Sequence, residues 1–293
     1  MAVRFQLVID CIDPDRLADA SQQRGMTTGH AGQGIAELVR PVVNVVLMSE
    51  RCGYLPGMAE HRAIELGGIR LAYQVWGSPA APPLVLLHAL AEGATDWDGV
   101  APAFARHWRV YAPDLRGHGR SDWPGDYSLE VMRADVLGFL DALGLDRVDL
   151  IGHSMGGAVA LLLAEEHPER IDRLILEDVM APLPRKRTIP ARPGGELPYD
   201  WEMVLAIRRQ IDDPDPAWLE RLGQIIAGTL VIGGGPGSPI PQDRVAELAR
   251  RIPGARSETI PAGHLIHAAE PEAFTQTALL FLRPGQAPAG SPR

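Results

Sequence analysis

A serine between two glycines, placed where an apolar run gives way to a second, longer one, most constrains what this chain can fold into. Residues 148–151 read as a buried strand and residues 157–164 as a buried helix, and Gly152-His153-Ser154-Met155-Gly156 joins them. Side chains two positions before and after the serine would collide in so sharp a turn, which explains glycine at 152 and 156. The pattern predicts a strand–turn–helix that exposes Ser154 as a nucleophile, although a bystander serine in a glycine-rich turn gives the same letters.

A nucleophilic serine needs a base, and the sequence offers nine histidines. The last predicted strand, residues 256–260, leads through a short loop to His264, and a helix follows from about Glu270. A loop at the carboxyl end of a parallel strand lies at the same edge of the sheet as the turn at Ser154. His264 is therefore the predicted base and His267 the nearest alternative, while His153 is expected to point away from the substrate.

Four segments in this order resemble the α/β-hydrolase family: residues 83–90, 114–121, 152–157 and 263–264. The resemblance covers residues 58–283 and implies an eight-stranded, mostly parallel sheet flanked by helices, with the site at the carboxyl ends of the strands. Residues 183–225 interrupt the alternation of strands and helices and are predicted to form a small lid. The alternative is a surface excursion that does not touch the substrate.

The resemblance also implies an oxyanion hole, formed by the backbone N–H groups of Met155 and Leu90. The family usually has glycine where this chain has Ala89, so the close backbone approach at this loop is a departure from the pattern. The predicted pocket walls are mostly apolar and include Trp97, Trp201 and Leu265 beside the two oxyanion residues.

The acid that would orient His264 is where the chain departs most from the family. Relatives usually carry an aspartate after the seventh strand, here residues 229–232, but the following loop has no carboxylate before Asp243, which suits the start of a helix. Some relatives place the acid after the sixth strand, which ends here in Glu177-Asp178. Asp178 is the predicted acid because it takes the acid's place when the strand ends are aligned, whereas Glu177 is expected to point to the opposite face. Glu177 is kept as the alternative, and a remote or missing acid stays open.

Charge and composition narrow the partners. The formal net charge of −9 argues against nucleic acid and anionic membrane surfaces, and the substrate is expected to be a small molecule. The two cysteines, Cys11 and Cys52, lie outside the hydrolase-like region, so no disulfide framework is expected there. No secretory pattern is evident, and the protein is predicted to be cytoplasmic. No metal or organic cofactor is expected, and the oligomeric state is left open.

The ends of the chain do not share the hydrolase pattern. Residues 1–57 are predicted to be a poorly packed or accessory extension; their first fifteen or so residues resemble the start of a glyoxalase-type domain, without room for its paired modules. Residues 284–293 are predicted to be a flexible tail.

The resemblance implies a serine hydrolase that cleaves a small or medium carboxylic ester or lactone through an acyl-serine intermediate. Acyl transfer, carbon–carbon bond hydrolysis and perhydrolysis could run on the same residues. A ligand-binding relative without catalysis is the remaining alternative, favoured by Ala89 and by the absence of an acid at Gly237.

Overall fold

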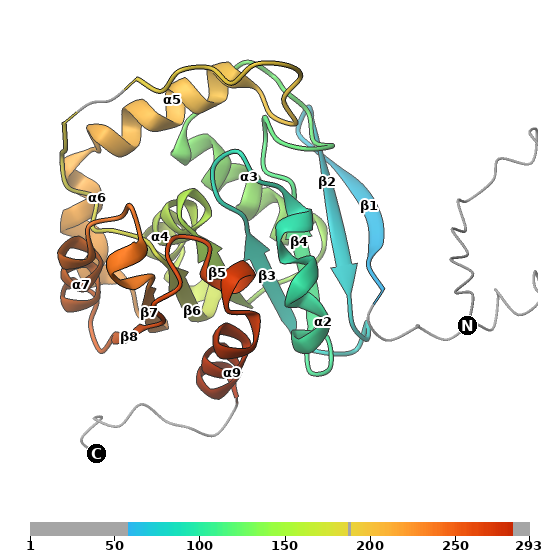
Figure 1. The fold of residues 1–293 in the computed structure, drawn as a ribbon. Coiled ribbons are helices and arrows are strands. Elements are labelled where there is room, and N and C mark those ends of the chain that lie inside the picture. The colour runs from blue at the N-terminus through green and yellow to red at the C-terminus, as the bar shows by residue number, and fades with distance from the viewer. Residues whose placement is uncertain (1–57, 187–188, 284–293) are drawn as a thin grey trace, which may run out of the picture. The chain divides into compact units, whose positions relative to one another are not determined.

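The computed structural model describes residues 58–186 and 189–283 (Figure 1). The predictions for the N-terminal extension and for the tail therefore lie outside the described residues.

An eight-stranded sheet organises the described chain. Its spatial order is β1-β2-β4-β3-β5-β6-β7-β8, in which β1–β2 and β2–β4 pair antiparallel and the other neighbours pair parallel. This confirms the predicted mostly parallel sheet. The strands are β1 (Glu60–Leu66), β2 (Ile69–Trp76), β3 (Pro83–Leu87), β4 (Arg109–Pro113), β5 (Val148–His153), β6 (Ile171–Glu177), β7 (Gly228–Gly233) and β8 (Arg256–Thr259).

Helices connect the strands and pack on both faces of the sheet. The α-helices are α2 (Ala101–Phe104), α3 (Leu129–Ala142), α4 (Met155–Glu166), α5 (Trp201–Asp212), α6 (Pro216–Arg221), α7 (Gln242–Arg251), α8 (Ile266–Ala269) and α9 (Pro271–Leu282). The 3-10 turns are η2 (Ala94–Gly99), η3 (Pro168–Arg170), η4 (Leu222–Gln224) and η5 (Gly235–Gly237).

Two hydrophobic cores, one on each face of the sheet, follow from the two-residue period of the strands. In β3, Val85 and Leu87 belong to the core beneath α3, α4 and α7, whereas Leu84 and Leu86 belong to the core beneath η2, α2 and α9. Both cores contain fully buried side chains, so the strands read as nearly continuous apolar runs.

The insertion between β6 and β7 contains α5, α6 and η4. Helix α5 is amphipathic and buries Met203, Val204 and Ile207. Its N-terminus is capped by Asp200, whose side chain accepts from the Glu202 N–H at 3.0 Å and from the Tyr127 hydroxyl at 2.7 Å. Figure 1 shows α5 across the top of the molecule. The predicted 183–225 excursion therefore contains ordered helices fixed to the main body.

Candidate active site

The turn between β5 and α4 places Ser154 in a strained backbone conformation. Its φ is 51° and its ψ is −112°, values that L-residues rarely adopt. A Cβ on Gly152 would lie 2.6 Å from the Cα of Gly157, and one on Gly156 would lie 2.4 Å from the Leu87 carbonyl oxygen. Both positions therefore require glycine, as the sequence pattern predicts, and the serine is held at the end of β5.

Ser154, His264 and Asp178 form one hydrogen-bonded series. The Ser154 Oγ lies 3.0 Å from His264 Nε2, and His264 Nδ1 lies 2.7 Å from an Asp178 carboxylate oxygen. A proton on Nδ1 lets the ring donate to Asp178 and accept from the serine hydroxyl. The structure thus brings together the three residues that the sequence nominates as nucleophile, base and acid.

Asp178 is buried and held by the loop that follows β7. It accepts hydrogen bonds from the Gly234 N–H at 2.9 Å, the Gln242 amide at 3.1 Å and the Ser238 hydroxyl. Burial pushes the pKa of Asp178 upward, but the hydrogen bonds from His264, Ser238, Gly234 and Gln242 together hold that pKa below its ordinary value. The carboxylate is therefore ionised at neutral pH.

The two residues predicted to supply the oxyanion hole belong to two segments of the chain. Met155 is the first residue of α4, where N–H groups have no acceptor within the helix, and Leu90 lies in the loop after β3. Two buried histidines brace that loop: His88 Nε2 accepts from the Leu115 N–H at 2.9 Å, and His118 Nε2 accepts from the Ala91 N–H at 3.2 Å. Burial lowers the pKa of His88 to about 4 and that of His118 to about 3, so both are neutral acceptors.

A cavity of about 410 Å³ opens beside Ser154, within the range of small-molecule sites. Leu90, Met155 and Leu265 line it, as predicted, together with His264 and the residues after β6.

Two predicted pocket walls are wrong. Trp97 is fully buried in the opposite core, where η2 packs on α8 and α9, and its ring stacks on His267 with centroids 4.2 Å apart. Trp201 is the first residue of α5 and packs against the core. It is not among the described residues that line the cavity. The wall near the insertion is formed instead by Ile211, Pro214 and Trp218.

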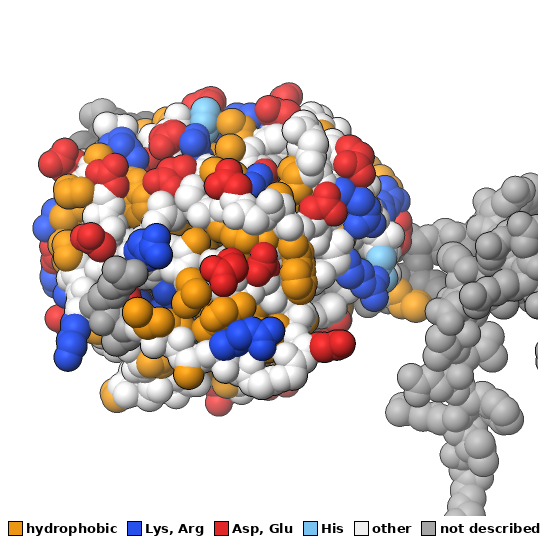
Figure 2. Space-filling view, turned by 90° about the horizontal axis from the view of Figure 1, so that it is seen from above, with side chains coloured by type: hydrophobic (Ala, Val, Ile, Leu, Met, Phe, Trp, Pro, Cys, Tyr) orange, Lys and Arg blue, Asp and Glu red, His pale blue; other side chains and the backbone are white. Residues whose placement is uncertain are grey.

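The face seen from above mixes charge signs. Figure 2 shows hydrophobic side chains toward its middle, with acidic and basic side chains interspersed around them. The described residues thus form no single-sign patch on this face. Across the described part of the chain, no helix is long and apolar enough to cross a membrane.

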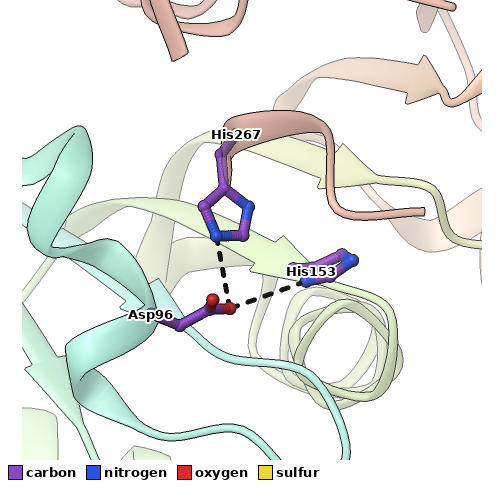
Figure 3. A group of neighbouring side chains, drawn as sticks. All are labelled: Asp96, His153 and His267. Atoms are coloured by element: carbon purple, nitrogen blue, oxygen red, sulfur yellow. Dashed lines mark ion pairs between the residues drawn. The ribbon is translucent and has the colours of Figure 1, made fainter. Parts of the chain in front are cut away.

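The side chain of Glu177 points away from Ser154 and has a different partner from that of Asp178. Its carboxylate accepts from the backbone N–H and from Nδ1 of His267, each at 2.9 Å. His267 Nε2 lies 3.2 Å from Asp96 (Figure 3). With Glu177 on Nδ1, the imidazole therefore stands between two carboxylates. Burial lowers the pKa of His267, but Asp96 and Glu177 outweigh it and raise that pKa to about 10. His267 is therefore a buried cation. Glu177 meets Ser154 only through its backbone carbonyl, which accepts from the Ser154 N–H at 3.0 Å, while its carboxylate is bound to His267.

His153 links this buried group to the base. Its Nε2 lies 2.8 Å from the backbone carbonyl of His264, and its Nδ1 faces Asp96 at 4.0 Å (Figure 3). The ligand atoms of Asp96, His153 and His267 all lie within 4.8 Å of one another. Two imidazoles and a carboxylate are donors that Zn²⁺ accepts, so these three residues could hold a metal ion once His267 loses its Nε2 proton. The sequence interpretation did not bring Asp96 into this neighbourhood.

We expect His267→Gln to destabilise the fold, because it leaves two buried carboxylates without their cation. Breaking a buried ion pair costs about 3–5 kcal/mol, which urea unfolding would measure at pH 6.5. The folded state binds the His267 proton up to about pH 10, whereas the unfolded state releases it near pH 6.5, so stability falls between these values. The difference from the wild type should therefore shrink as the pH approaches 10. The exposed His107→Gln serves as the control, and equal stabilities for both variants would contradict the prediction.

The comparisons with known proteins agree with this geometry. A sequence model described as the alpha/beta hydrolase fold matches residues 82–207. The crystal structure of the enol-lactonase from Burkholderia xenovorans is similar, with a TM-score of 0.69 and 28% identity over 75% of this chain and 99% of that one. The described residues thus have the α/β-hydrolase fold.

Two curated relatives show how wide this family is. The sn-1-specific diacylglycerol lipase ABHD11 of Mus musculus is 27% identical over 74% of this chain and 87% of its own length. A 2-hydroxymuconate semialdehyde hydrolase of Pseudomonas is 42% identical, over 39% of this chain and 42% of its own. The chain spans only 32–43% of the length of the first five curated relatives it matches.

Proposed function

We propose that this α/β-hydrolase is a serine hydrolase that cleaves a small or medium carboxylic ester or lactone. The observation that carries the proposal is the series from Ser154 Oγ through His264 to Asp178, because its serine end opens onto a largely apolar cavity. This arrangement suits nucleophilic attack on a carbonyl group with removal of the serine proton by an imidazole.

In the proposed reaction, Ser154 Oγ bonds to the carbonyl carbon while its proton passes to His264 Nε2. The N–H groups of Met155 and Leu90 receive the negative charge on the carbonyl oxygen. His264 then gives its proton to the departing alkoxide, which leaves the acyl group on Ser154. Water, deprotonated by His264, attacks this acyl-serine, and His264 returns the proton to Ser154 Oγ as the carboxylic acid leaves. Asp178 holds the ring in its Nδ1–H form and stabilises the imidazolium.

The lid prediction enters the proposal through the same cavity. Ile211, Pro214 and Trp218 of the 183–225 insertion lie in the cavity wall, so we assign this insertion the role of shielding the acyl group from water. The enol-lactonase and the lipase among the relatives bear names of ester- or lactone-cleaving enzymes, which supports the same reaction class.

Carbon–carbon bond hydrolysis is the second candidate reaction for the same residues. One observation favours it, the local 42% identity to a 2-hydroxymuconate semialdehyde hydrolase. Such a substrate would use the same nucleophile and base, so the fold does not separate the two reactions.

A fluorophosphonate probe tests the proposal directly. We expect stoichiometric labelling of the full chain, which mass spectrometry would locate at Ser154. A parallel panel of p-nitrophenyl esters, lactones and 2-hydroxymuconate semialdehyde would rank the candidate reactions by kcat/KM. Folded protein that neither labels nor turns over any panel member would favour the ligand-binding alternative and overturn the proposal.

A further inference from the structure

The cavity beside Ser154 follows one face of α4 from its first turn to its last. Met155, Ala158, Leu161, Leu162 and Glu165 all line it. Their spacing of three and four residues is that of a single helix face. The cavity therefore runs along the helix axis, away from the nucleophile, and its wall is apolar until the final turn.

Glu165 stands at the far end of this wall. Its side chain is 1% exposed, and Arg221 Nε lies 3.3 Å from one of its carboxyl oxygens. Its other oxygen, Oε1, is buried and has no hydrogen-bond partner among the described residues. Burial raises the pKa of Glu165 to about 8, although Arg221 opposes the shift. A buried oxygen without a partner carries a desolvation cost that a donor on a bound molecule would offset.

The length of the channel follows from the helix. From Met155 to Glu165, α4 advances ~15 Å at 1.5 Å per residue. Helical side chains lean toward the N-terminus of their helix, so the Glu165 carboxyl lies a few ångströms closer to Ser154 than the Glu165 backbone does. An extended carbon chain advances roughly 1.2 Å per bond, so the channel accommodates about eight to ten carbon atoms.

We propose that this cavity is an acyl-chain channel in which Glu165 sets the length of the acyl group and binds a hydroxyl at its far end. The substrate class is then an ester or lactone of a medium-chain acid, with the ω-hydroxy acid favoured over the unsubstituted one. The carbonyl lies at Ser154, the chain lies along Ala158 and Leu162, and the terminal hydroxyl forms a hydrogen bond with Glu165 Oε1. This inference rests on the proposed esterase function.

The test measures kcat/KM for p-nitrophenyl esters from two to sixteen carbon atoms, together with the ω-hydroxyoctanoyl ester. For the wild type we expect an optimum at about eight to ten carbon atoms, a decline of roughly tenfold or more for the longest chains, and a roughly threefold to tenfold preference for the ω-hydroxy ester. Glu165→Ala should move the optimum to longer chains by about two carbon atoms. Glu165→Leu, which fills the space without an acceptor, should keep the length optimum and abolish the hydroxyl preference.

Glu166→Gln is the matched control. Glu166 neighbours Glu165 in the sequence and pairs with Arg133 and Arg221, but it does not line the cavity, so its chain-length profile should equal that of the wild type. A wild-type optimum at two to four carbon atoms, or a profile unchanged in Glu165→Ala, would overturn the channel while leaving the esterase function intact. Absence of hydrolysis of every ester, together with absence of fluorophosphonate labelling, would instead reject the proposed function.

Discussion

Ser154→Ala is expected to lower kcat for ester hydrolysis on the order of 10⁶-fold, because the covalent route through the serine is lost and only binding and oxyanion contacts remain. Steady-state kinetics on the best ester of the panel would measure the loss. The substitution removes one partly buried hydroxyl, and the strained backbone at this position is already present in the wild type, so the fold should persist.

The control for this variant is Ser128→Ala. Ser128 caps α3 through its hydroxyl, which accepts from the Val131 N–H at 3.1 Å, and it lies outside the serine–histidine–aspartate series. Its loss should cost about 1 kcal/mol of stability and leave kcat unchanged. An active Ser154→Ala enzyme would require another nucleophile and would contradict the mechanism.

Asp178→Asn is expected to keep the fold and lower kcat on the order of 10³–10⁴-fold, because the amide favours the wrong ring form of His264 and does not stabilise the imidazolium. The variant's pH–rate profile gives a second readout that a merely structural role would not move. The pKa of Asp178 lies below its ordinary value, so its contribution to stability is present above the unfolded-state pKa and is lost as the pH falls through the folded-state pKa.

Two carboxylate variants provide the comparison. Glu177→Gln weakens the partner of His267, so we expect a loss of stability while kcat at a permissive temperature stays within about tenfold of the wild type. Asp243→Asn, at the start of α7, should alter neither quantity much. If Glu177→Gln lost kcat and Asp178→Asn did not, the role of the acid would pass to Glu177.

Much of the fold was predictable because its signals are local. The double glycine at 67–68 predicts the β1–β2 hairpin, and the alternation of strand and helix patterns predicts the parallel sheet. The proposal of Asp178 over Glu177 also used a local rule, since neighbouring residues at a strand end point to opposite faces. In the structure, Asp178 contacts His264 while Glu177 contacts His267.

The buried ion group and the position of Trp97 were not predictable in this way. Asp96 and His267 come from distant parts of the sequence, and their contact depends on which face of the sheet the η2 segment covers. Nothing local distinguishes a tryptophan that lines a pocket from one that packs beneath α9. Two features of the sequence could have pointed to this buried ion group. They are the acidic residue Asp96 next to Trp97 and the second histidine, His267, three residues after His264.

The position of Asp178 directly after β6 has a consequence for how this sequence can change by insertion and deletion. Ser154 and Asp178 directly follow His153 and Glu177, which are paired in the register of β5 and β6. The spacing of Ser154 and Asp178 is thereby fixed by the sheet, and a slip of one residue would displace one from the other by about 3.3 Å. His264 instead arrives on a loop. Added or lost residues are therefore tolerable in the insertion. They are not tolerable within either of these two strands or in the loop after β7, where Gly234 and Ser238 hold the Asp178 carboxylate.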